Sequence, residues 1–137
     1  EFGSTYDYPY LSICTTGTHD MNPLRAWWEE DRGVTQRFYN QVLGAWGDAP
    51  YFCEPWICEQ VVAMHLKSPA MLTVLPLQDW LAMDGELRRE NPNDERINVP
   101  ANSRHYWRYR MHLSLEELLK ADNLNAMIRQ KIAESGR

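Results

Sequence analysis

The stretch YLSICTTGTHDMNPLRAWWEED, residues 10–31, is the most informative part of this chain for its fold. It begins with a short β-prone apolar run, passes through small hydroxylated residues and a glycine, and continues into a segment rich in tryptophan. The run and the residues just before it predict a strand over 8–15 that is buried on both faces. Pro23 suits the first turn of the following helix, with Asp20 or Asn22 placed to cap it.

A second unit of the same kind is MLTVLPLQDWLAM, residues 71–83. Its wholly apolar start predicts another buried strand over 71–75, and the chain then turns at Pro76 into a short helix around Trp80 and Leu81. Strands that are buried on both faces are typical of parallel sheets, because helices cover both sides of such sheets. Two strands are too few to close a sheet, so the sequence predicts an α/β chain that forms part of a larger sheet or barrel.

Helical spacing of apolar residues predicts the segments between and after these units. One helix follows Pro23 and breaks at Gly33, a second opens at Thr35, and a third begins at Pro55. Residues 85–104 have no period and predict a long surface loop, which in a compact domain is often functional.

The C-terminal part of the chain carries two further patterns. RHYWRYRMH, residues 104–112, interleaves arginine with aromatic residues, which favours a strand with one aromatic face packed inward over a base-stacking surface. Residues 114–135 predict a helix that opens with a capping box of Ser114 and Glu117 and carries an apolar stripe.

Composition excludes several classes of protein. The length of 137 residues suits one domain or a large piece of one, and the net charge of −5 argues against a general nucleic-acid binder. No apolar run approaches the roughly 20 residues that span a bilayer, and Glu-Phe-Gly at the start does not resemble a signal peptide. The three cysteines are expected to be buried free thiols in a reducing compartment, the cytoplasm. We expect no metal and no cofactor.

Polar side chains at the exits of the two strands are the candidates for chemistry. His19 and Asp20 follow the first strand, and Gln78 and Asp79 follow the second, where α/β folds hold their ligands. The alternative for either aspartate is a simple helix cap. Asn98, in the long loop, offers both a donor and an acceptor to a sugar hydroxyl, although Asn-Val-Pro also shapes turns.

Four stretches, in order, resemble the C-terminal part of the 4-α-glucanotransferases, the amylomaltases or disproportionating enzymes of the α-amylase clan. They are residues 10–31, quoted above, PWICEQVVAMHLKSPAMLTVLPLQDWLAM (55–83), INVPAN (97–102) and YWRYRM (106–111). The resemblance runs from about Glu1 to Leu119 and is greatest to the long, plant-cytosolic-type branch, whose Trp-Trp-Glu-Glu-Asp continuation stands at 27–31.

This resemblance implies that the chain is the C-terminal portion of a (β/α)8 barrel, incomplete on its own, with 10–15 as a late strand and 71–75 as the last. The family transfers α-1,4-glucan segments to acceptor sugars with retention of configuration. Asp20 matches the carboxylate that stabilises the transition state, and His19, Asn98 and Asp79 match positions at or near the substrate, with Asp79 in a partly structural segment.

The family's nucleophilic aspartate and acid/base glutamate belong to earlier strands, so the chain alone is expected to be inactive. Its expected partners are α-1,4-glucans, maltooligosaccharides and the rest of the barrel, with no nucleic acid and no membrane. The alternative is a non-catalytic module that binds glucan or a partner protein through its aromatic residues.

Overall fold

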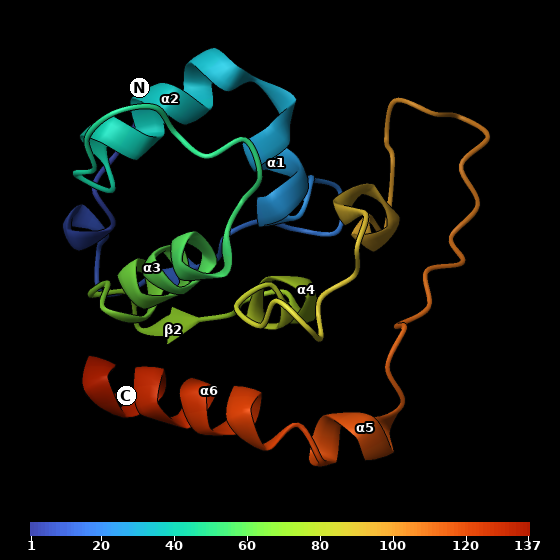
Figure 1. Cartoon of the computed structure of the whole chain (residues 1–137). Coiled ribbons are helices and arrows are strands. Elements are labelled where there is room, and N and C mark those ends of the chain that lie inside the picture. Colours follow the sequence, from blue (N-terminus) through green and yellow to red (C-terminus); the bar gives the residue numbers. More distant parts are fainter.

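The computed structural model describes residues 1–137 and shows one small parallel sheet among helices, with an extended loop before the last two helices (Figure 1). The elements, in chain order, are η1 (Thr5–Asp7), β1 (Ile13–Cys14), α1 (Leu24–Glu30), α2 (Arg32–Gln41), α3 (Pro55–Leu66), β2 (Leu72–Thr73), α4 (Leu77–Leu81), η2 (Pro92–Glu95), α5 (Leu115–Leu119) and α6 (Asp122–Ser135). The α/β class predicted from the sequence is confirmed.

The two strands pair in parallel, as predicted, with Ile13 opposite Leu72 and Cys14 opposite Thr73. They are much shorter than the predicted 8–15 and 71–75, and the prediction that they are buried on both faces is wrong for this chain. Ile13 is 66% exposed and Val74 59% exposed, while Cys14 is buried. A two-stranded sheet has only one internal ladder, so its outer edges and one of its faces lack neighbours.

Helix α3 lies at the centre of the core. Its apolar character around most of its circumference lets it contact both α4 and α6, while α1 and α2 pack together on the other side (Figure 1). Trp28 of α1 is fully buried, and its indole N–H donates to the Pro50 carbonyl at 3.0 Å. The buried apolar cluster gathers side chains from four helices, α1, α3, α4 and α6, namely Leu24, Trp28, Ile57, Val61, Val62, Leu66, Leu81 and Leu124 among others.

The boundaries of the first two helices differ from the predicted ones. The sequence predicts a break at Gly33, but α2 begins at Arg32, because the Asp31 carboxylate accepts the N–H groups of Gly33 and Val34 and so caps the helix. Thr35, the predicted start, lies buried inside α2, where its hydroxyl donates to the Trp28 carbonyl at 2.6 Å.

The C-terminal region contains two corrections. The predicted aromatic strand over 104–112 is absent: this segment is irregular, and Tyr106 and Trp107 are exposed. The single predicted helix is two helices, because the chain bends at Lys120 and Ala121. The Ser114–Glu117 capping box is confirmed at the start of α5. The stripe is buried only in part, since Leu115 and Leu119 of α5 face solvent.

The three cysteines are buried free thiols, as predicted. The sulfur atoms of Cys53 and Cys58 lie 3.4 Å apart, and the hydrogen bond between them, together with burial, raises the pKa of Cys53 well above its ordinary value. None of the helices combines the length and the apolarity needed to cross a membrane.

Candidate functional site

The structure brings together three of the five residues that the sequence singled out, whereas Asp79 and Gln78 are buried, with the Gln78 amide donating to the Glu95 carbonyl at 3.1 Å. The Asn98 side-chain amide donates to Asp20 Oδ1 at 2.6 Å, and the Asn98 backbone N–H donates to the His19 carbonyl at 3.1 Å. His19 Nε2 lies 3.3 Å from the same Asp20 oxygen. The turn after β1 and the long loop therefore meet over a separation of 78 residues, and they place an amide and an imidazole beside one carboxylate.

Asp20 does not cap α1. The residue before that helix is Pro23, which offers no side-chain hydrogen bond. The Asp20 side chain is about half exposed, at 49%, and its Oδ1 is the oxygen that contacts His19 and Asn98. The other oxygen makes no hydrogen bond within this chain, so it can accept one from a ligand hydroxyl. A half-exposed carboxylate held on one side only is well suited to bind sugar.

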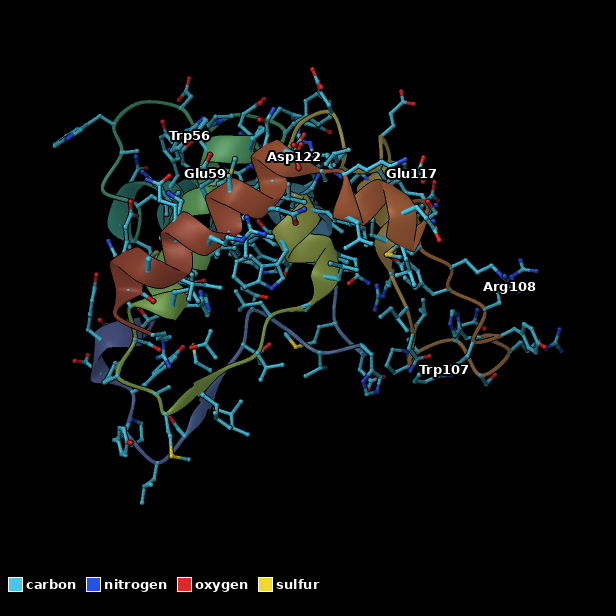
Figure 2. The ribbon with its side chains drawn as sticks, turned by 90° about the horizontal axis from the view of Figure 1, so that it is seen from below. Trp56, Glu59, Trp107, Arg108, Glu117 and Asp122 are labelled. Carbon is cyan, nitrogen blue, oxygen red and sulfur yellow. The ribbon has the colours of Figure 1, made fainter.

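Trp107 completes one wall of this cluster. Its ring centre lies 5.3 Å from that of His19, with the ring planes at 52°. Figure 2 shows Trp107 and Arg108 on the extended loop that projects beyond α5, far along the chain from the turn after β1. An exposed indole beside a carboxylate and an imidazole gives a flat apolar face next to hydrogen-bonding groups, an arrangement that fits a sugar ring.

Hydrogen bonds from neighbouring residues hold the loop that carries Asn98 in place. The Arg96 Nε–H donates to the Asn98 carbonyl at 2.9 Å, and His105 Nε2 lies 2.9 Å from the Ile97 carbonyl. Arg25 of α1 reaches the segment just before them: its guanidinium donates to the carbonyls of Arg89 and Glu90 at 2.6 and 3.1 Å. The position of Asn98 thus depends on contacts that extend to the first helix.

Arg25 also pairs with a buried carboxylate of η2. Its Nη1 lies 3.5 Å from Glu95 Oε2, and both side chains are almost completely buried. Burial raises the pKa of Glu95 above its ordinary value, although Arg25 acts in the opposite direction. Neither carboxylate oxygen of Glu95 has a hydrogen-bond partner, and a cavity of about 30 Å3 lies between Glu95 and the His19 turn.

Asp79 occupies a different place from the other three candidates. It is 1% exposed, and its carboxylate accepts the Thr16 hydroxyl and the Leu24 N–H, the latter at 3.0 Å. It thereby supplies the helix cap that Asp20 and Asn22 do not, since Leu24 is the first residue of α1. Burial raises the pKa of Asp79, while its two hydrogen bonds act to lower the pKa. The buried Asp79 carboxylate therefore links the segment that follows β2 to the segment that follows β1.

Two contributors to the site were missed by sequence reasoning. The sequence predicts a strand around Trp107, and a lone arginine early in a helix, such as Arg25, gives no local signal of function. Their contacts run to residues 19, 89, 90 and 95, so only the folded chain reveals them.

Comparison with known proteins agrees with the fold and the motifs. The sequence profile of the family described as 4-alpha-glucanotransferase matches residues 1–116. The chain is 39% identical over its full length to 4-alpha-glucanotransferase DPE2 of Oryza sativa subsp. japonica, covering 14% of that protein. It is 32% identical over 89% of its length to the 4-alpha-glucanotransferase of Chlamydia caviae, covering 23% of that protein.

A solved structure has the same fold. It is the amylomaltase from Streptococcus agalactiae in complex with acarbose, which matches 98% of this chain with a TM-score of 0.69 at 21% sequence identity. The chain covers 26% of that structure, so it spans about a quarter or less of the proteins it matches. The family profile matches residues 1–116 of the 137, and the chain therefore belongs to the 4-alpha-glucanotransferase family.

Proposed function

We propose that this chain is the C-terminal portion of the catalytic (β/α)8 barrel of a retaining 4-alpha-glucanotransferase, which moves α-1,4-glucan segments between sugars. The observation that carries the proposal is the cluster of Asp20, His19 and Asn98, in a chain whose family membership is shown. A non-catalytic module is less well supported, because the relatives that match nearly all of this chain are named as transferases.

The exposed apolar side chains of the two strands support the assignment of the chain to a barrel. In a closed barrel of parallel strands every edge is paired and helices cover the outside, so apolar side chains stand on both faces of each strand. Here Leu11, Ile13, Leu72 and Val74 are apolar and exposed. The proposal assigns these faces to contact with the remaining strands of the same barrel, with β1 as a late strand and β2 as the last.

Within this barrel Asp20 acts at the transition state. As the glycosidic bond breaks, positive charge develops on the sugar ring, and a nearby carboxylate stabilises that charge more than it stabilises the neutral substrate. His19 and Asn98 hold Oδ1 of this carboxylate, which leaves the second oxygen for the sugar hydroxyls. Trp107 offers its face to the sugar ring beside them.

The covalent steps need two further carboxyl groups. In a retaining mechanism one carboxylate displaces the leaving sugar and forms a glycosyl–enzyme bond, while a second carboxylic acid protonates the departing oxygen and later deprotonates the acceptor hydroxyl. We assign both groups to strands outside this chain, so this chain alone has no transfer activity. The free thiols of the three cysteines fit a reducing compartment, and the proposal places the enzyme in the cytoplasm.

Asp79 contributes by positioning, in this proposal. Replacing it with alanine leaves the Leu24 N–H and the Thr16 hydroxyl without a partner, which is expected to lower the free energy of unfolding of the full-length enzyme by about 3 kcal/mol. Asp79→Asn is the matched control: an amide accepts from Leu24 and donates to Thr16, and it carries no buried charge. Urea denaturation measures both variants.

The raised pKa of Asp79 determines how the stability of wild type and of Asp79→Asn depends on pH. Because the folded state holds the proton more tightly, ionisation of Asp79 costs stability once the pH exceeds its ordinary pKa of 3.8. Asp79→Asn is therefore expected to be at least as stable as wild type at pH 7, and its advantage disappears as the pH falls toward 3.8. An asparagine variant as unstable as the alanine variant would contradict this role.

The activity itself is tested with maltotriose. The full-length enzyme is expected to convert maltotriose into glucose and maltopentaose, because a glucan segment passes to a sugar acceptor and not to water. Chromatography of the products measures glucose and the longer chains together. Glucose and maltose in equal amounts without longer products would show hydrolysis, and an unchanged substrate would favour the non-catalytic module; either result overturns the proposed function.

A further inference from the structure

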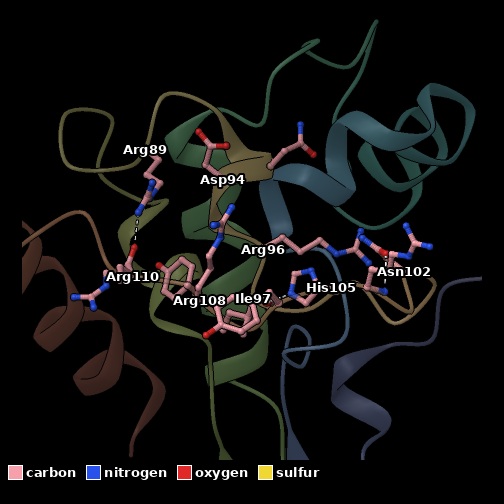
Figure 3. A pocket seen from close by; sticks show the side chains of 12 residues that line it. Arg89, Asp94, Arg96, Ile97, Asn102, His105, Arg108 and Arg110 are labelled. Atoms are coloured by element: carbon pink, nitrogen blue, oxygen red, sulfur yellow. Dashed lines mark hydrogen bonds between the residues drawn. The ribbon is translucent and has the colours of Figure 1, made fainter.

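A large basic cavity lies behind the loop that carries Asn98. Its volume is about 710 Å3, and five arginines line it: Arg89, Arg96, Arg104, Arg108 and Arg110. Figure 3 shows Arg89 and Arg108 on one side with Asp94, and Arg96 on the other side with His105 and Asn102. This volume lies in the range of cavities that bind small molecules.

The positive charge of this cavity is not neutralised within this chain. None of the five arginines makes an ion pair, and Asp94 is the one carboxylate in the lining. The chain as a whole carries a net charge of −5, with 14 basic and 19 acidic residues. More than a third of its basic residues therefore converge on one concave surface of an acidic chain, and such a surface attracts an anion.

Arg89 provides a second, independent observation. Its Nε–H is buried and has no hydrogen-bond partner, while its Nη2 donates to the Arg110 carbonyl and its guanidinium lies 5.9 Å from the centre of the Tyr109 ring. The guanidinium is thus held in place through Nη2 alone, and its other N–H groups make no hydrogen bond within the chain. Its Nη1 group has no hydrogen-bond partner in the chain and is not fully buried, so it can donate to an oxyanion in the cavity.

The cavity adjoins the candidate site through two residues. Arg96 lines the cavity, and its Nε–H holds the Asn98 carbonyl. Ile97 lines the cavity and also the small space beside the His19 turn. A ligand in the arginine cavity therefore lies against the other side of the loop that presents Asn98 to the sugar.

We propose that this cavity binds the phosphate group of a phosphorylated sugar. Guanidinium groups present paired N–H donors that match phosphate oxygens, and several of them around one cavity suit a dianion better than a single carboxylate. The phosphate belongs either to a glucan chain that occupies the neighbouring sugar site or to a free sugar phosphate. The assignment to a glucan chain rests on the proposed function, whereas the phosphate site itself does not.

The test is equilibrium binding to the full-length protein in an Asp20→Asn background, so that the ligand is not consumed. Calorimetry compares maltotriose, maltotriose phosphorylated at one 6-hydroxyl and glucose 6-phosphate. The phosphorylated trisaccharide is expected to bind at least tenfold more tightly than maltotriose. Arg104→Gln combined with Arg108→Gln removes two exposed guanidiniums that make no hydrogen bond in this chain, and it is expected to abolish this preference.

Arg129→Gln is the matched control, since Arg129 is an exposed arginine of α6 outside the cavity, and it is expected to retain the full preference. Equal binding of glucose 6-phosphate and the phosphorylated trisaccharide identifies a free sugar phosphate as the source, and weaker binding of glucose 6-phosphate identifies the glucan.

Three results would overturn the inference. They are equal affinity for maltotriose with and without phosphate, a preference that survives in the double variant, and tighter binding of a single-stranded oligonucleotide than of the phosphorylated sugar. If wild type disproportionates maltotriose but shows no phosphate preference, the inference fails while the proposed function stands.

Discussion

Replacing Asp20 with asparagine is expected to lower the rate of maltotriose disproportionation by the full-length enzyme about a thousandfold. The substitution keeps the size of the side chain and removes its charge. The neutral amide no longer stabilises the positive charge that develops on the sugar ring, although His19 and Asn98 remain beside it. Glucose release from maltotriose measures the rate.

The fold is expected to survive this change. The Asp20 side chain is half exposed and does not cap α1, so its replacement leaves no buried group without a partner. Its melting temperature should stay within about 2 °C of wild type. Asp7→Asn, at an exposed carboxylate of η1, is the control and should retain full activity. Near-normal transfer by Asp20→Asn would remove Asp20 from the catalytic machinery.

Replacing Arg25 with methionine is expected to destabilise the full-length enzyme by about 3–5 kcal/mol. Methionine keeps much of the apolar stem and removes the guanidinium. Glu95 then remains buried without a counter-charge, and the carbonyls of Arg89 and Glu90 lose their donors. The loop that leads to Asn98 loosens as a result, so activity should fall with stability. Urea denaturation measures the loss.

The double variant Arg25→Met/Glu95→Gln separates charge from packing. Since a glutamine leaves no buried charge, we expect it to recover a large part of the stability lost at neutral pH. In the single variant no guanidinium counteracts the effect of burial, so the pKa of Glu95 rises further. The free-energy cost of ionising Glu95 then grows as the pH increases above 4.5, the ordinary pKa of a glutamate. The deficit should therefore shrink as the pH falls toward 4.5. No recovery in the double variant would contradict the role of this ion pair.

Much of the fold follows from local sequence. The helices at α3 and α4, the capping box at Ser114 and the parallel order of the strands could be predicted, because each depends on periodicity or on residues within one turn of each other. The errors have tertiary causes. The start of α1 is capped by Asp79, 55 residues away, and the strands are exposed because the chain provides each of them with only one neighbour.

The candidate site also combines residues that the local sequence identifies with contacts that only the folded chain forms. Asp20, His19 and Asn98 could be selected because the exits of parallel strands and the long loops of α/β folds are where ligands bind. Two contacts could not be predicted: the pairing of Asn98 with Asp20 and the packing of Trp107 on His19. Each joins residues far apart in the chain and depends on how the loop folds back. The burial of Asp79 was equally hidden, because a carboxylate at a helix start is usually exposed.

The central claim is that Asp20 acts on the transition state and not on the bound substrate. The most direct measurement is the pair of steady-state constants, kcat and KM, for maltotriose in wild type and Asp20→Asn of the full-length enzyme. An interaction made only in the transition state lowers kcat and leaves KM nearly unchanged. We predict that kcat falls about a thousandfold while KM changes by less than about threefold. A large rise in KM with kcat unchanged would show that Asp20 only binds substrate, and it would contradict the account.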